Sequence, residues 1–163
     1  MDKVASFQNW VEKAPQVFTA DTLWKMKVYQ DAMFLADLAW HDATKLMSDR
    51  RTIGLSEQLY EAVGSIGANI SEGYSRSSGR DRARFYEYSL GSARESRGWY
   101  YDGRFVLGDE VATHRMQFLT QVIRLLLAML PDERARTIRE EKAEYKVEPQ
   151  SSLEMLLEKA PLP

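Results

Sequence analysis

The chain of 163 residues carries 22 lysines and arginines against 24 aspartates and glutamates, a formal net charge of −2, and a hydrophobic content of 44%. This composition is typical of one folded domain and lacks the basic surplus of a dedicated nucleic-acid binder. Because the chain has no cysteine, disulfides, thiolate chemistry and cysteine-ligated zinc or iron–sulfur sites are excluded. We find no signal-peptide core and no run long enough to span a bilayer, which predicts a cytoplasmic protein.

The first 21 residues predict an amphipathic N-terminal extension. Val4, Phe7, Trp10 and Val11 follow the spacing of one helix face. Such a segment either packs on the flank of its own domain or docks a partner protein as a helix in a groove. The sequence leaves both interpretations open.

Residues 22–47 predict the first long helix, which carries two neighbouring apolar stripes. Together the stripes exceed the arc that a helix on a single core needs. The helix is therefore either deeply buried or meets another subunit through its second stripe. We predict an oligomer interface at the bulky residues of that second stripe, which are Met26, Met33, Trp40 and Met47.

Residues 55–74 predict a second helix, although its three glycines each cost roughly 1 kcal/mol relative to alanine. The apolar residues keep helical spacing through Gly64, Gly67 and Gly73. A third helix is predicted at residues 80–105, with Ser78 as its N-cap. We expect the glycines and Ala68 to pack closely against small residues of the third helix, namely Ser89, Gly91, Ser92 and Ala93.

Residues 110–130 predict the fourth helix, capped by Asp109 and ended by Pro131, which lacks the N–H that continues a helix. Four amphipathic helices with short turns indicate an all-α, up-down-up-down four-helix bundle at residues 22–131. Residues 132–163 predict a charged C-terminal tail that closes with a short helix.

Four polar residues fall near the packing sides of the second and third helices: Asn69, Glu72, Ser92 and Glu95. A buried carboxylate needs a partner, or its pKa shifts until it is neutral. The four are therefore either a catalytic carboxylate pair with its neighbours or a structural network that fixes helix register. We favour the structural network, because the sequence places no nucleophile, base or oxyanion donor around them.

Metal chemistry in such a bundle needs several inward glutamates and a Glu-x-x-His pattern on two helices. The chain has only two histidines, His41 and His114, and each follows an acid by four residues rather than three. Phosphate-binding loops, dinucleotide fingerprints and hydrolase motifs are missing from the sequence. The sequence predicts no metal site, no cofactor and no enzymatic activity.

Residues 74–104 hold seven arginines against four acids, with aromatic residues between them. Arginine and aromatic side chains together suit phosphate contact and base stacking. The alternative is a solvated helix face whose charges pair within the helix. We predict a nucleic-acid surface at six arginines, two of them in a neighbouring turn: Arg50, Arg51, Arg76, Arg80, Arg82 and Arg84.

Two stretches carry a family resemblance, "SIGANISEGYSR" at residues 65–76 and "RARFYEYSLGSARES" at residues 82–96. They resemble the 23S rRNA-intervening-sequence proteins, a bacterial four-helix bundle family that includes the accessory variability determinants of diversity-generating retroelements. The resemblance extends over about residues 23–131.

This resemblance implies a non-enzymatic homo-oligomer, with a pentamer as the best expectation. It also implies a scaffold that assists a nucleic-acid-processing partner such as a reverse transcriptase, with RNA or DNA bound weakly or indirectly. The alternative is a purely structural or protein-interaction oligomer with no direct nucleic-acid binding.

Overall fold

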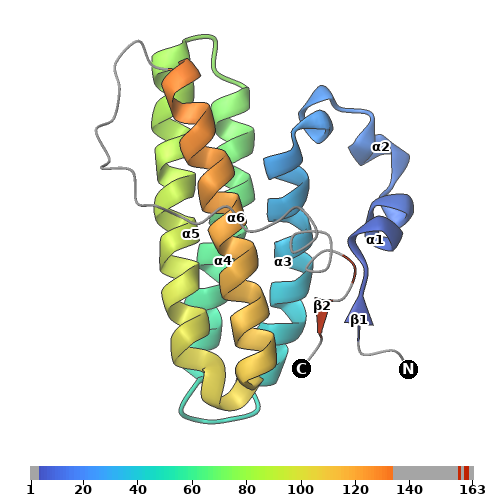
Figure 1. The fold of residues 1–163 in the computed structure, drawn as a ribbon, viewed down its shortest axis with the longest axis vertical. Helices are drawn as coiled ribbons and strands as arrows, with labels where there is room; N and C mark the ends of the chain where they lie inside the picture. The colour runs from blue at the N-terminus through green and yellow to red at the C-terminus, as the bar shows by residue number, and fades with distance from the viewer. Residues whose placement is uncertain (1–3, 134–157, 159, 162–163) are drawn as a thin grey trace.

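A computed structural model describes residues 4–133, 158 and 160–161 of the chain. Within this part, four long helices run side by side in alternating directions (Figure 1). They are α3 (Lys27–Leu46), α4 (Ile53–Tyr74), α5 (Gly79–Leu107) and α6 (Asp109–Glu133). The predicted all-α bundle is confirmed.

The core of the bundle lies between these four helices. Leu35, Val63, Ala93 and Val122, one from each helix, have no exposed surface. Apolar residues recur three and four positions apart in each helix, so each helix turns one face inward. Full burial of one valine or leucine side chain contributes about 1.5–3 kcal/mol, which makes this shared core the main source of stability.

The segment before α3 packs along α3. Four short elements make it up: β1 (Val4–Ala5), α1 (Phe7–Lys13), α2 (Gln16–Thr19) and the 3-10 helix η1 (Thr22–Lys25). The ring centroids of Phe7 and Trp10 lie 5.4 and 5.5 Å from that of Phe34 on α3. The N-terminal extension therefore covers part of its own bundle, as the first of the two interpretations expects.

A second short strand brings a late part of the chain to this extension. β2 (Ala160–Pro161) pairs antiparallel with β1, Val4 opposite Pro161 and Ala5 opposite Ala160. In Figure 1 the two strands lie beside each other below α1. Segments near both ends of the sequence thus meet on one side of the bundle.

Helix boundaries differ from the prediction at α3 and α6. α3 begins at Lys27 rather than at residue 22, because η1 forms a separate 3-10 turn before it. α6 contains Pro131 and continues to Glu133, so the predicted stop is wrong. A proline removes only its own backbone donor, and this loss is small where the helix is about to end.

A cap residue lies in the α4–α5 turn and a glycine in the α5–α6 turn. The Ser78 hydroxyl accepts a hydrogen bond from the backbone N–H of Asp81 at 3.4 Å, which confirms Ser78 as the N-cap of α5. Asp109 is the first residue of α6 rather than its cap. Gly108 alone separates α5 from α6 at a φ of 90°, a conformation that glycine adopts without steric cost.

The glycines of α4 do not share the single role predicted for them. A Cβ on Gly73 would lie 2.8 Å from Cε1 of Tyr86 on α5, so α4 does pack closely on α5 there, but against an aromatic ring and not against the predicted small residues. Gly67 faces α3 instead, because a Cβ added there would lie 3.1 Å from Sδ of Met33. Gly64 is exposed and has no atom within 4 Å of an added Cβ. The regular apolar spacing determines which residues are helical but not which helix each glycine faces.

Candidate interaction surfaces and the buried polar centre

A buried ion pair lies in the core between α3 and α6. Nε of Arg115 donates to Oδ2 of Asp42 at 2.7 Å, and Nη2 donates to Oδ1 at 3.2 Å. Neither side chain has any exposed surface. The Tyr100 hydroxyl on α5 donates to the same Oδ2 at 2.9 Å. Three helices therefore meet at one carboxylate.

The buried position of this ion pair shifts the pKa of Tyr100. Burial raises the pKa of its hydroxyl well above the ordinary value of 10.0, and the negative charge of Asp42 raises it further. The hydroxyl is therefore a neutral donor at physiological pH. A fully paired buried charge of this kind fixes helix register, although it adds little net stability over an apolar contact.

His114 is attached to the same centre. Nη1 of Arg115 lies 2.9 Å from Nδ1 of His114, and since guanidinium can only donate, this ring nitrogen is the acceptor. The nitrogen therefore faces a cation rather than a carboxylate. The other histidine, His41, lies on the exposed side of α3. Within residues 4–133, 158 and 160–161 there is no cluster of three or more metal-ligating side chains.

The four residues predicted to form a polar network are not brought together. The Asn69 amide donates to the Ser65 carbonyl at 2.8 Å, within its own helix. Glu72 is exposed and pairs with Arg76 one turn later. Both contacts lie along α4, because a long polar side chain reaches its own i−4 or i+4 neighbour more easily than the next helix.

The same holds on α5. The Ser92 carbonyl accepts a hydrogen bond from the Ser96 hydroxyl at 2.8 Å. Glu95 is exposed and accepts one from the Trp99 indole at 3.4 Å. The Ser89 hydroxyl on α5 donates to the Ile66 carbonyl on α4 at 3.0 Å, and this contact is buried. The sequence predicts Ser89 only as a small packing residue.

The six predicted nucleic-acid arginines lie at two ends of the bundle. Arg50 and Arg51 are in the turn between α3 and α4, and the other four are near the turn between α4 and α5. α4 separates the turns, and its 22 residues span about 30 Å at 1.5 Å per residue. An up-down bundle places successive turns at opposite ends, so the six do not form one surface.

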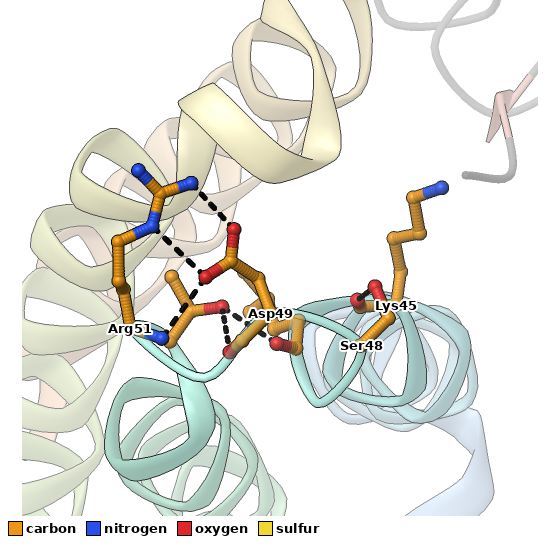
Figure 2. Close-up of polar contacts among 6 residues, drawn as sticks. Lys45, Ser48, Asp49 and Arg51 are labelled. Carbon is orange, nitrogen blue, oxygen red and sulfur yellow. Dashed lines mark hydrogen bonds and ion pairs between the residues drawn. The ribbon is translucent and has the colours of Figure 1, made fainter.

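At the α3–α4 turn, Arg51 is held by an acid. Figure 2 shows its guanidinium beside the carboxylate of Asp49. Nε donates to Oδ1 at 2.9 Å and Nη2 donates to Oδ2 at 2.5 Å. The hydrogen bonds from the Arg51 side chain and backbone lower the pKa of Asp49 to about 2. The charge of Arg51 is thus largely balanced within its own turn.

At the α4–α5 turn, the four arginines are close in sequence and differ in role. Nη1 of Arg82 donates to the Arg76 carbonyl at 3.1 Å and so helps to close the end of α4. The Arg76 guanidinium lies 4.8 Å from the ring centroid of Phe85. Arg84 donates to the Tyr88 hydroxyl at 2.9 Å. Arg80 is exposed, so this end presents cations beside aromatic rings.

An exposed apolar patch crosses α3 and α4. Trp40 is 60% exposed, and its ring contacts that of Tyr60, 45% exposed, with centroids 6.0 Å apart. Met47, the residue that follows the end of α3 and lies two helical turns after Trp40, is 62% exposed. Met26 and Met33 are partly buried against the chain's own core. Of the predicted interface, two residues are thus exposed and two are mostly covered.

None of the described helices is long and apolar enough to cross a membrane.

Known proteins with a similar sequence or fold identify the family of this chain. Residues 24–105 match the family described as 23S rRNA-intervening sequence protein. A crystal structure from Bacteroides thetaiotaomicron VPI-5482, described as a protein of unknown function from the S23 ribosomal protein family, is similar at a TM-score of 0.60. The two chains are 21% identical, and the match covers 63% of this chain and 97% of the other, which shows a common fold. No curated protein matches the chain. The chain belongs to the family of 23S rRNA-intervening sequence proteins.

Proposed function

We propose that the protein is a non-enzymatic helical scaffold that assembles with further copies of itself and supports a partner that processes nucleic acid. A reverse transcriptase is one candidate partner, and five copies is the expected stoichiometry. The exposed patch of Trp40, Tyr60 and Met47 carries this proposal. Large aromatic side chains that gather on a surface mark an interaction site, because water solvates them poorly.

The surface beside the patch favours another helix as its occupant. Tyr60, Gly64 and Ala68 are spaced four apart on α4 and all three are exposed. Residues four apart share one helix face, so small residues follow directly on from the aromatic pair. Small side chains let a neighbouring backbone approach closely. A symmetric assembly that buries this face would need no further partner.

The test is the oligomeric state of two matched variants. We expect light scattering at micromolar concentration to show an assembly for the natural chain and a monomer for Trp40→Glu, because a carboxylate in an apolar interface is costly to desolvate. Phe105→Glu is the control, since Phe105 is 81% exposed on α5, outside the patch. It should keep the assembly.

Circular dichroism and thermal unfolding should show both variants folded. A monomeric natural chain would refute self-assembly. An assembly that survives Trp40→Glu would refute this patch as its interface.

A second candidate function is a protein-interaction oligomer with no direct nucleic-acid role. The pairing of Arg51 with Asp49 and of Arg76 with Glu72 favours it, because each pair removes a cation from the basic set. The net charge of −2 acts in the same direction.

A further inference from the structure

His114 is a titratable side chain in the interior of the bundle. It lies on α6 next to Arg115 and is 7% exposed. Its ring meets that of Phe118, one turn later on α6, edge to face with the centroids 6.3 Å apart. Histidine ordinarily gains a proton at about pH 6.5, within the range that cells reach. The protonation state of this ring therefore sets a charge inside the bundle.

The hydrogen bond from Arg115 requires a neutral ring. Nη1 of Arg115 lies 2.9 Å from Nδ1 of His114, and a guanidinium group has N–H donors but no acceptor. Nδ1 must therefore keep its lone pair, which leaves the proton of the neutral ring on Nε2. A protonated ring has an N–H at both positions and would direct its Nδ1–H at another donor. Protonation therefore breaks this bond.

The Arg115 guanidinium that faces the ring is already balanced by an acid. Asp42 on α3 accepts from it through both carboxylate oxygens, at 2.7 and 3.2 Å, and neither side chain is exposed. Tyr100 on α5 donates to the same carboxylate as a neutral hydroxyl. Glu110, one turn before His114 on α6, is exposed, so solvent screens its charge. A proton on His114 would thus place a second cation beside Arg115.

We propose that His114 makes the contact between α3 and α6 sensitive to pH: a neutral ring supports the Arg115–Asp42 pair, and a protonated ring repels Arg115 and weakens the pair. The unfolded chain takes up this proton at about pH 6.5, whereas the folded chain must first break the bond to Arg115. Stability rises with pH wherever the unfolded state binds more protons. The contribution of His114 is therefore complete above about pH 6.5 and is lost as the pH falls below this value.

The test is urea unfolding of the full chain at pH 7.5 and pH 5.5. His114→Asn is the matched variant, because its amide oxygen is attached to Cγ, as Nδ1 is, and can accept from Arg115 without titrating. A proton bound by the unfolded chain alone changes the folding equilibrium constant about tenfold over this range. From pH 7.5 to 5.5, the folding equilibrium constant of the natural chain should therefore fall about tenfold further than that of His114→Asn. Carboxylates that titrate in both chains cancel in this comparison.

His41→Asn is the control, since His41 lies on the exposed side of α3. It should keep the pH dependence of the natural chain. The chain has two histidines, so this variant also lets nuclear magnetic resonance follow the His114 ring alone, with its own site intact. At pH 5.5 the ring nitrogen shifts of the folded variant should show a neutral ring with its proton on Nε2. The proposal is overturned if the natural chain and His114→Asn lose equal stability, if His41→Asn removes the pH dependence, or if the His114 ring is protonated at pH 5.5.

Discussion

Asp42 and Arg115 have no exposed surface, so protein groups must stabilise both charges. Arg115 and Tyr100 donate hydrogen bonds to the Asp42 carboxylate, and Asp42 in turn balances the charge of Arg115. The unfolded chain would solvate both ions in water, and the folded chain replaces that water with a few fixed hydrogen bonds. Breaking one side of such a pair leaves an isolated buried charge, which costs far more than the intact pair contributes. The pair is thus a strong constraint on how α3 and α6 meet.

We expect Asp42→Ala to destabilise the fold by about 3–5 kcal/mol, because Arg115 would remain buried without its counter-charge. Urea unfolding measures this change. Asp49→Ala is the matched control, since it also removes a carboxylate from an arginine but in a surface turn, where solvent replaces the partner. Equal losses for the two variants would contradict the role assigned to Asp42. The double change Asp42→Leu with Arg115→Met should recover much of the stability.

The sequence did not reveal this pair, and the reason is physical. Asp42 and Arg115 are 73 positions apart, and nothing local to either indicates that the other will be its partner. Each replaces an apolar residue in an otherwise regular stripe, which is the one signal that the sequence holds. The sequence instead predicts a buried polar network that includes Glu72 and Glu95, yet both lie on exposed sides of their helices. Spacing alone places a residue near the edge of a stripe and does not settle on which side of that edge it falls.

α4 and α5 show how far helical spacing determines a packed interface. The extent of α4 was predicted to within two residues at its start, because apolar periodicity over twenty residues is a strong signal. Its contacts were not, because a glycine reports only that a Cβ is missing. At Gly73 the missing Cβ leaves space for the Tyr86 ring, whereas at Gly91 on α5 it faces open space.

We therefore expect opposite effects from two substitutions of the same kind. Gly73→Ala would place its Cβ 2.8 Å from Tyr86 Cε1 and 3.0 Å from Phe85 Cβ. Such overpacking should cost about 1–3 kcal/mol. Gly91→Ala meets no atom within 4 Å and should stabilise α5 by up to about 1 kcal/mol through helix propensity. Thermal unfolding of the two variants measures both. A Gly73→Ala protein as stable as the natural chain would show that α4 and α5 can move apart.

The bundle separates the two groups of arginines that the sequence predicts as one surface. Topology places the α3–α4 and α4–α5 turns at opposite ends, so any nucleic acid would meet either Arg50 and Arg51 or the four arginines near residues 76–84. The second group has more cations and adjacent rings. Arg82 also bonds the end of α4, so changing it would alter the turn as well as the charge.

We expect weak binding of single-stranded RNA at low salt that depends on the α4–α5 end. Changing Arg80 and Arg84 together to alanine should reduce affinity for all sequences. It should also lower the slope of log affinity against log salt by about 0.7 for each phosphate that is no longer neutralised. Changing Arg50 and Arg51 together is the control with the same decrease in charge, and it should have little effect. Filter binding at two salt concentrations measures both. If the natural chain binds no RNA at low salt, the direct role is refuted and the protein-interaction oligomer remains.

The pairing of β1 with β2 has a consequence for the order in which the chain folds. Each long helix can find the next one across a short turn, but Ala5 must find Ala160 across almost the whole polypeptide. Closing that loop costs roughly 3 kcal/mol more entropy than closing one of the interhelical turns. Two residue pairs offset little of this cost before the bundle exists to hold both strands nearby. The β1–β2 pair should therefore form after the helices have docked. In native-state hydrogen exchange, the backbone amides of β1 should exchange well before those of α4.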